Sequence, residues 1–288
     1  MSRKVIAKIV GGIGNQLFCY AAARRFALRN DAALCLDLDF FRSDVHYGRS
    51  YRSDSFELPP HEILQSRRVL PAQLDLYAWR LKRRLAGAGV LPGCDWLIES
   101  TPGVFDARLL EARVTRTTGM DGYWQDERYF SDIEPVLRQD LTFRPEVSSR
   151  SRDIGQRIAA SNAVAVHVRR LYGDGGVLDV AYYRKAIEQI IFRVERPEFF
   201  CFGDDPGWLR EHWPRDLPMT LVHDPEVGGE VEDLRLMAGC RHFIVANSTF
   251  SWWGAWLGAN LGKVVIAPRA KGLRYRVRPA EGWIEIDW

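Results

Sequence analysis

The sequence has few cysteines and no long apolar run. Its five cysteines lie singly along the 288 residues, with no C-x-x-C pair. This pattern argues against a zinc site and favours reduced thiols in a cytosolic compartment. Neither a signal peptide nor a run of about 18 apolar residues is recognisable. We therefore expect a cytoplasmic protein with at most peripheral contact with a membrane.

An excess of charge of one sign is also missing. The 40 Lys and Arg residues nearly balance the 37 Asp and Glu residues, and the formal net charge is +3. Such a small charge does not by itself indicate a nucleic-acid-binding protein, and basic residues do not alternate with aromatic ones on an evident face. The hydrophobic fraction of 47% and the ten tryptophans instead indicate a globular protein with a large core.

In the first half of the sequence, strand-like runs precede loops rich in glycine or acidic residues. Residues 5–10 predict a strand, residues 11–16 a tight loop, and the apolar residues after it recur at helical spacing. A second strand is expected at 33–40. Further along, the pattern predicts an amphipathic helix with a basic face at 66–85, a short strand at 96–98 and a strand that turns into a helix at 122–130.

The second half alternates strands and helices more regularly. Five short apolar runs predict strands at 163–168, 199–202, 219–222, 243–246 and 264–267. Helices are expected between them, at 148–161, 180–194, 207–212, 230–238 and 247–261. This alternation predicts right-handed crossovers and a doubly wound parallel sheet. We expect an α/β protein of two Rossmann-like domains, residues 1–147 and 148–288, with a ligand cleft between them.

Two adjacent arginines follow the apolar run at 163–168. Open α/β sheets bind ligands at the carboxyl ends of their strands, where Arg169 and Arg170 are expected. A guanidinium group suits an oxyanion that offers two oxygens at once, such as a phosphate. We interpret both residues as ligands of a diphosphate-bearing substrate; the simpler alternative is a solvated strand end.

A second candidate anion site lies at the start of the helix expected at 247–261. Asn247, Ser248, Thr249 and Ser251 bring side-chain amide and hydroxyl groups to that position. Together with the free N–H groups of a helix N-terminus they form an anion site that needs no metal. Simple N-capping accounts for part of this pattern. Because the helix start and the two arginines both follow strands, we expect them to hold the same pyrophosphate.

The first glycine loop contains Gly12 and Gly14 and ends with Asn15 and Gln16. Backbone N–H groups at such a helix start can hold an anion. The spacing is not G-x-G-x-x-G, so an NAD site is poorly indicated. Asn15 and Gln16 place two amides at the mouth of the loop, where they can bind substrate. Alternatively, Asn15 only caps the helix.

The strand expected at 33–40 carries Asp37 and Asp39. A D-x-D pair can bind the metal of a nucleotide-sugar enzyme. The simpler interpretation is that alternation merely puts both carboxylates on one face of a strand, since so short a motif is common by chance. Asp233 is similarly ambiguous, because it can bind a guanine edge or serve as a first-turn helix carboxylate.

Several motifs in order along the chain resemble one known family. They are Gly11-Gly12-Ile13-Gly14-Asn15-Gln16-Leu17-Phe18, Gly122-Tyr123-Trp124-Gln125 with Tyr129-Phe130, His167-Val168-Arg169-Arg170, Tyr182-Tyr183-x-Lys185-Ala186-Ile187, Phe202-Gly203-Asp204-Asp205, Asp233-Leu234-x-Leu236-Met237 and Asn247-Ser248-Thr249-Phe250-Ser251-Trp252-Trp253-Gly254. These motifs resemble the α-1,2-fucosyltransferases of glycosyltransferase family eleven, and the resemblance covers about residues 5–268.

The resemblance implies a GT-B-like fold, GDP-fucose as donor, inversion at the anomeric carbon and no metal or other cofactor. It places Arg169 on the β-phosphate and Asn15 beside the reacting sugar, and we take these two as catalytic. His167 and Asp233 match residues that hold the guanine, and Ser248 and Thr249 match residues that hold phosphate. The full set of donor-binding candidates is Gly12, Gly14, His167, Arg170, Asp233, Asn247, Ser248, Thr249 and Ser251, and the acceptor-side candidates are Gln16, Trp124, Gln125 and Asp126.

The expected reaction moves L-fucose to the 2-hydroxyl of a galactose-type acceptor in a surface glycan. A galactose-containing, lipid-linked oligosaccharide suits a cytosolic enzyme, and the basic helix at 66–85 would hold the protein near the membrane that carries it. The sequence does not rank the candidates for the general base, which are Asp37, Asp39, Asp126, Glu127 and Asp174.

One departure from the family pattern lies directly after the two arginines. Family members usually continue with Gly-Asp-Tyr, whereas this chain reads Leu171-Tyr172-Gly173-Asp174-Gly175-Gly176. The altered loop leaves open a related 3,6-dideoxy sugar donor such as GDP-colitose. Two other classes stay open: a metal-dependent GT-A-type enzyme that uses Asp37 and Asp39, and a non-catalytic nucleotide-sugar-binding module.

Overall fold

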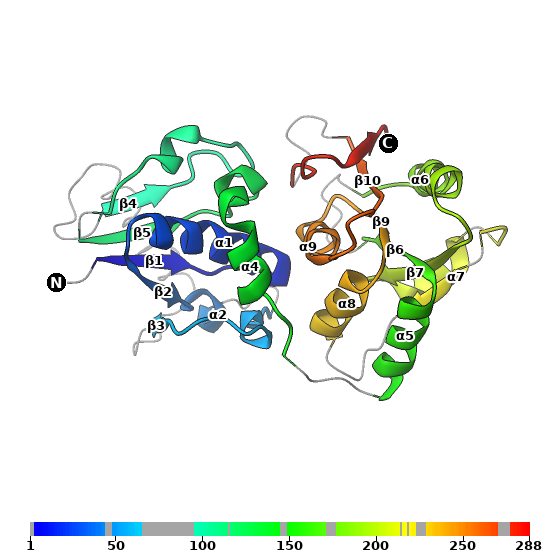
Figure 1. The fold of residues 1–288 in the computed structure, drawn as a ribbon, viewed down its shortest axis with the longest axis horizontal. Helices are drawn as coiled ribbons and strands as arrows, with labels where there is room; N and C mark the ends of the chain where they lie inside the picture. Colours follow the sequence, from blue (N-terminus) through cyan, green and yellow to red (C-terminus); the bar gives the residue numbers. More distant parts are fainter. Residues whose placement is uncertain are drawn as a thin grey trace. The chain divides into compact units, whose positions relative to one another are not determined.

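The computed structural model describes the chain in ten stretches, and in these the chain forms two compact units, residues 1–142 and 143–288. Each unit is built around its own parallel sheet (Figure 1). The division predicted after residue 147 falls in a segment outside the described residues. The described stretches are 3–43, 48–64, 95–114, 116–144, 149–170, 177–213, 215–217, 219–222, 229–269 and 277–288.

The sheet of the first unit is entirely parallel. Its strand order is β3 (Glu62–Leu64), β2 (Ala33–Asp37), β1 (Lys4–Lys8), β5 (Thr117–Asp121) and β4 (Asp95–Ile98). The chain therefore builds outward from β1 to β2 and β3 on one side, and then adds β4 and β5 on the other side. The strand order thus reverses between β1 and β5, which is where open α/β sheets bind ligands.

Helix α1 (Ile13–Arg29) follows β1 and is the most deeply buried of the helices described in this unit. A run of alanines at 21–23 lets it lie close to the sheet, and Leu17 and Phe18 are fully buried. The helix ends at Asn30, whose amide donates to the carbonyl of Phe26 at 2.9 Å and accepts the N–H of Val114 at 3.0 Å. The C-terminus of α1 is therefore tied to the segment that leads into β5.

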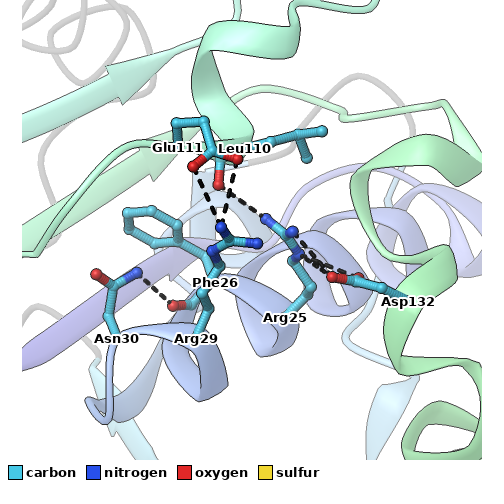
Figure 2. Close-up of polar contacts among 7 residues, drawn as sticks. All are labelled: Arg25, Phe26, Arg29, Asn30, Leu110, Glu111 and Asp132. Carbon is cyan, nitrogen blue, oxygen red and sulfur yellow. Dashed lines mark hydrogen bonds and ion pairs between the residues drawn. The ribbon is translucent and has the colours of Figure 1, made fainter.

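Two arginines near that end of α1 bind the segments beside it, as Figure 2 shows. Arg25 is buried; it pairs with Asp132 at 2.9 Å and donates to the carbonyl of Leu110 at 3.1 Å. Arg29 pairs with Glu111 at 3.2 Å, and both of these side chains are exposed. One buried and one exposed guanidinium group thus bind the same helix to residues about 80 to 110 positions further along the chain.

Short helices complete the first unit. The described elements are α2 (Phe40–Ser43), α4 (Glu134–Asp140) and the 3-10 helices η1 (Ser53–Ser55), η2 (Ala107–Leu110), η3 (Glu127–Tyr129) and η4 (Ser131–Ile133). The buried side chain of Asp140 accepts the phenol of Tyr20 at 2.7 Å and an N–H of Arg24 at 2.8 Å, so α4 is bound to α1 by polar contacts as well as by packing.

The sheet of the second unit is also entirely parallel. Its order is β11 (Ile284–Ile286), β10 (Val265–Pro268), β9 (His242–Ile244), β6 (Asn162–Val168), β7 (Pro197–Gly203) and β8 (Thr220–Val222). Here the order reverses between β6 and β9. Strand β6 is buried from Ala163 to Val168, as expected for a central strand covered on both faces.

The two faces of this sheet carry separate apolar clusters, and each cluster includes side chains of helices. Helices therefore cover both faces. The helices are α5 (Ser149–Ala160), α6 (Val180–Arg193), α7 (Pro206–His212), α8 (Gly229–Ala238) and α9 (Thr249–Leu257). Helices α8 and α9 approach closely at Gly254, where an added Cβ would clash with the side chain of Met237. Glycine at this position therefore sets how near the two helices can lie.

The predicted alternation of the second half is confirmed, with differences of a few residues at the ends of elements. The last helix ends at Leu257 rather than 261, because the backbone of the next residue, Gly258, leaves the helical conformation with a ψ of 121°. The segment 122–130 is not a strand that turns into a helix: β5 ends at Asp121 and single 3-10 turns follow. The helix predicted at 66–85 lies outside the described residues. Among the helices that the structure describes, none has the length and apolarity to cross a membrane.

Candidate functional site

In the second unit, the segments predicted to hold one pyrophosphate lie at the same place in the sheet. Strands β6 and β9 are paired neighbours, and the strand order reverses between them. Arg169 and Arg170 follow β6, and the segment 247–251 follows β9 and starts α9. The structure therefore brings both segments to the carboxyl edge of the sheet at its switch point, where ligands of such sheets bind.

His167 connects these two segments. Its side chain is buried, and its ring centroid lies 5.3 Å from the ring of Phe250 in the first turn of α9. Burial, and then the charge of Arg169, lower the pKa of His167 from 6.5 to about 3. Its Nδ1 atom is buried with no hydrogen-bond partner. A neutral imidazole with an unsatisfied polar atom beside an aromatic ring suits a flat heterocycle that supplies the missing hydrogen bond.

Arg170 is held by the neighbouring strand β7. Its backbone N–H donates to the carboxylate of Asp204 at 2.7 Å, and its guanidinium carbon lies 4.1 Å from the ring centroid of Trp208. Trp208 lies in the first turn of α7, where its backbone N–H donates at 2.8 Å to the carboxylate of Asp205, the N-cap of the helix. Arg170 is thus stacked on an aromatic ring. Arg169 is half-buried, and its charge contributes to the lowered pKa of His167.

The start of α9 is a compact turn that uses some of its own hydroxyls. The Ser248 hydroxyl accepts the N–H of Phe250 at 3.3 Å and is the N-cap of the helix. The Ser251 hydroxyl, fully buried, accepts the N–H of Ala246 at 3.2 Å and donates to the carbonyl of Ser248 at 3.3 Å. N-capping therefore accounts for Ser248, and Ser251 shapes the turn. Asn247 is buried, and Thr249 is half-buried on the first helical turn.

Two tyrosines of α6 hold the strand ends that carry these residues. The Tyr183 phenol donates to the carbonyl of His167 at 3.1 Å, and the Tyr182 phenol donates to the carbonyl of Val245 at 2.7 Å. Both side chains are buried, and burial raises the pKa of Tyr183 far above its usual value, which keeps it protonated and donating. One helix therefore fixes the ends of both β6 and β9.

Asp233 lies on α8, the helix that packs against α9 through Gly254. It is half-buried and lies beside Glu232, a buried carboxylate whose oxygen is 3.2 Å from the guanidinium of Arg235. The acidic residues in the first turn of α8 are Glu230 and Glu232, and Asp233 comes after them. The simpler interpretation of Asp233 as a first-turn helix carboxylate is therefore wrong. The predicted contact with guanine is compatible with this position and stays a prediction.

The first unit has its own group of candidate residues at the switch point of its sheet. The glycine loop follows β1, and the turn at 122–126 follows β5, the strand paired with β1. Gly11 has a φ of +74°, in the left-handed region that favours glycine, and Gly12 is the N-cap of α1. No side chain caps the helix at Gly12. Gly14 is buried in the first turn.

Asn15 and Gln16, the two amides of this loop, differ in their surroundings. The Gln125 amide donates to the side-chain oxygen of Asn15 at 2.9 Å, although the two residues are 110 positions apart. Gln16 is fully buried and donates to the carbonyls of Gly11 and Ser50 at 3.0 and 2.9 Å. Its oxygen accepts the N–H of Arg52 at 2.8 Å. The Gln16 side chain therefore joins the glycine loop to the segment at 50–52.

Trp124 and Asp126, the other acceptor-side candidates, are also buried. The Trp124 ring packs edge-on against Tyr129 with centroids 5.5 Å apart. Asp126 accepts two N–H groups of the Arg128 guanidinium, at 2.8 and 2.6 Å, and caps the 3-10 helix η3. Both oxygens of the Asp126 carboxylate therefore contact the Arg128 guanidinium.

The predicted D-x-D pair at Asp37 and Asp39 forms a local turn. The Asp37 carboxylate accepts the backbone N–H of Asp39 at 3.0 Å just after β2 ends. Within the described stretches, no group of three or more His, Cys, Asp or Glu residues lies close enough together to hold a metal ion. The remaining candidate base in the altered loop, Asp174, lies outside the described residues together with the rest of that loop.

The sequence analysis does not identify two residues that support these sites, Trp208 and Glu99. Trp208 follows the Asp204-Asp205 motif closely, but its stacking on Arg170 depends on the pairing of β6 with β7. Glu99, a buried carboxylate just after β4, accepts the N–H of Tyr123 at 2.7 Å. An acidic residue directly after an apolar strand is the signal that indicates such a role.

The chain is similar to several known glycosyltransferases. Residues 106–276 match glycosyl transferase family 11. An α-1,2-colitosyltransferase of Escherichia coli is 27% identical over 303 residues and covers 98% of this chain and 99% of its own. The O-antigen biosynthesis glycosyltransferase WbnK of Escherichia coli is 27% identical, and the match covers 90% of this chain and 92% of WbnK. The mouse galactoside α-(1,2)-fucosyltransferase 2 is 26% identical, and the match covers 58% of this chain and 49% of the mouse protein.

Solved structures are similar in fold at low sequence identity. The fucosyltransferase NodZ from Bradyrhizobium has a TM-score of 0.54 at 18% identity, with 88% of this chain and 92% of that chain covered. Arabidopsis thaliana FUT1 in complex with GDP has a TM-score of 0.57 at 13% identity, with 97% and 72% covered. The predicted fold class, α/β of the GT-B type with two Rossmann-like domains, is confirmed. The GT-A-type alternative does not match this fold.

Proposed function

Because the chain belongs to glycosyltransferase family 11, we propose that this glycosyltransferase moves L-fucose from GDP-fucose to the 2-hydroxyl of a galactose-type acceptor in a surface glycan. The observation that carries the proposal is the junction of His167, Arg169 and the start of α9 at one switch point. An aromatic ring, an unsatisfied imidazole and a pair of guanidinium groups suit a nucleoside diphosphate.

In the proposed reaction the acceptor hydroxyl gives its proton to a carboxylate or to water and attacks C1 of the sugar while the bond from C1 to the GDP oxygen breaks. This single displacement inverts the anomeric carbon and passes through a state with oxocarbenium character. Negative charge then accumulates on the β-phosphate, where Arg169 stabilises it and the N–H groups at the start of α9 assist. Arg170, stacked on Trp208, holds the phosphates from the side of β7.

The proposal assigns separate roles to residues of the two units. His167 and Asp233 hold the guanine, with His167 as a neutral imidazole because burial lowers its pKa to about 3. Asn15 lies beside the transferred sugar at the glycine loop of the first unit. No metal is required, since cationic side chains and a helix start neutralise the leaving group.

A second candidate donor is GDP-colitose. An α-1,2-colitosyltransferase aligns over 98% of this chain, and the loop after Arg170 departs from the usual family pattern. The two sugars differ by one hydroxyl. A pocket built to bond that hydroxyl rejects the sugar without it by roughly 10⁴-fold, whereas a pocket that does not bond it discriminates by only about 10²-fold.

The test is to measure kcat/KM for GDP-fucose and GDP-colitose with a small set of galactose-terminated acceptors, and to identify the product by mass spectrometry and NMR. We expect transfer to the 2-hydroxyl with inversion and unchanged activity in EDTA. Activity that is lost in EDTA and restored by Mn²⁺ would contradict the metal-free proposal. Tight GDP binding without transfer to any acceptor would instead indicate the non-catalytic module.

Surface glycan assembly is also part of the proposal. One relative is named as an O-antigen biosynthesis glycosyltransferase, which favours a galactose-containing, lipid-linked oligosaccharide as the acceptor. Peripheral contact with a membrane stays a prediction, because the basic helix that motivates it lies outside the described residues. Sedimentation with anionic vesicles tests it, and a protein that stays in the supernatant at low salt would contradict it.

A further inference from the structure

The hydrogen bond between Gln125 and Asn15 joins the two loops at the switch point of the first sheet. Gln125 Nε2 donates to Asn15 Oδ1 at 2.9 Å. The Asn15 amide nitrogen lies on the other side, against Gly11, where an added Cβ would be only 2.6 Å from it. The amide of Asn15 therefore has one orientation, with its oxygen toward Gln125 and its nitrogen toward the glycine loop.

The turn that carries Gln125 has an unusual backbone. Trp124, the residue before it, has a φ of +54°. A bulky residue rarely adopts this left-handed conformation, and where it does the surrounding structure must hold it there. The Trp124 carbonyl accepts the N–H of Asp126 at 2.8 Å, so Gln125 is the central residue of a very tight turn. The buried ring of Trp124 prevents the turn from relaxing outward.

Buried polar groups anchor this turn from both sides. Before it, Glu99 accepts the N–H groups of Tyr123 at 2.7 Å and Gly103 at 3.2 Å. After it, the paired carboxylate of Asp126 caps the next 3-10 helix. These contacts fix the backbone of residues 123–126 without any help from Gln125. The Gln125 side chain is thus not needed to hold this turn, and it contacts Asn15 instead.

We propose that Gln125 is a positioning residue that acts through Asn15, instead of an acceptor-binding residue as the sequence alone suggests. Its N–H group holds the Asn15 amide in a single orientation while the sugar is transferred. The inference rests on the proposed function, in which Asn15 lies beside the reacting sugar. Without Gln125 the Asn15 amide can turn over, and only part of the enzyme is then ready for transfer.

The experiment is a double-mutant cycle in transfer with Asn15→Ala, Gln125→Ala and the double variant, using the donor that the wild-type enzyme accepts. We expect Gln125→Ala to lower kcat about fivefold to tenfold, the loss of one hydrogen bond, with KM for the acceptor unchanged. In the Asn15→Ala background, Gln125→Ala should have no further effect, because the residue it acts on is gone.

Two further variants keep the test decisive. Gln125→Glu has the same shape but at neutral pH cannot donate to Asn15, so it should match Gln125→Ala in kcat even if the alanine variant folds poorly. Its kcat relative to wild type should rise as the pH falls toward 5, because a protonated carboxyl donates again. Gln139→Ala, an exposed glutamine on α4, is the matched control and should be indistinguishable from wild type.

Independent effects of Asn15→Ala and Gln125→Ala, or a raised acceptor KM in Gln125→Ala, would overturn the inference and return Gln125 to the acceptor site. Calorimetry with GDP separates this outcome from failure of the proposed function. Wild-type protein that binds no GDP contradicts the proposed donor site, whereas GDP binding by all variants with additive losses of kcat contradicts only the role of Gln125.

Discussion

The ring of His167 at the end of β6 lies 5.3 Å from the ring of Phe250 in the first turn of α9. This contact joins two segments more than 80 residues apart and leaves a buried imidazole nitrogen without a hydrogen-bond partner. Arg169 follows two residues later. The arrangement makes separate predictions for the arginine, which acts on charge, and for the histidine, which is buried as the neutral form.

We expect Arg169→Ala to lower kcat roughly a hundredfold or more, since the loss of a preorganised donor to developing charge costs about 3–4 kcal/mol of barrier. Arg169→Lys should recover only part of the activity, because an ammonium group cannot make two parallel hydrogen bonds. Steady-state kinetics measure both. Arg152→Ala, an exposed arginine on α5, is the control, and near-wild-type transfer by a folded Arg169→Ala protein would contradict the assigned role.

The lowered pKa of His167 makes stability depend on pH. A histidine in the unfolded chain titrates near 6.5, whereas in the folded protein burial lowers the pKa of His167 to about 3. Between these values the unfolded state binds the additional proton, so stability is highest above pH 6.5 and falls as the pH falls, by up to about 1.4 kcal/mol per pH unit. Urea unfolding measures the free energy of unfolding at each pH from 7.5 to 5. This free energy should fall less steeply with falling pH in His167→Phe than in wild type, and the same pH dependence in both proteins would contradict this account.

The two arginines of Figure 2 provide a matched pair for stability. Arg25→Ala removes a buried guanidinium that binds both Asp132 and the Leu110 carbonyl, and we expect it to cost about 2 kcal/mol. Arg29→Ala removes an exposed pair with Glu111, which is worth about 0–1 kcal/mol. Urea unfolding of both variants measures the difference. Equal losses would show that burial does not decide the strength of these contacts.

The close approach of α8 and α9 predicts a strong effect of a larger residue at Gly254. The Gly254→Val side chain would collide with Met237, which is buried and has little room to move. We expect a loss of about 2 kcal/mol or more from overpacking. Gly262→Val, where nothing lies within 4 Å of an added Cβ, should change stability by less than about 0.5 kcal/mol. Thermal unfolding of the two variants makes the comparison, and equal midpoints would contradict it.

The sequence predicts the second unit better than the first, for a physical reason. Its strands are short apolar runs separated by helical patterns, so periodicity identifies them directly. Strand β11 is missed because Ile284–Ile286 is too short and half-exposed to give such a pattern. Helix α4 is missed because only one of its apolar residues, Leu137, is buried.

The candidate site is predicted in its position more than in its contacts. Arg169 and Asn247 lie at adjacent strand ends, as expected from the carboxyl edge of a parallel sheet. Gln16, in contrast, is interpreted as a substrate ligand from its place in the loop, but it holds the segment at 50–52. Contacts of this kind join residues far apart in sequence, and neither spacing nor composition carries information about them.

Each compact unit is made from one uninterrupted stretch of chain, with the division after Thr142. A single junction near this position is therefore enough to build a hybrid enzyme from two members of the family. Recombination at one point can give one unit a new partner half without interrupting either hydrophobic core. In this architecture, one genetic exchange is enough to combine two halves that evolved separately.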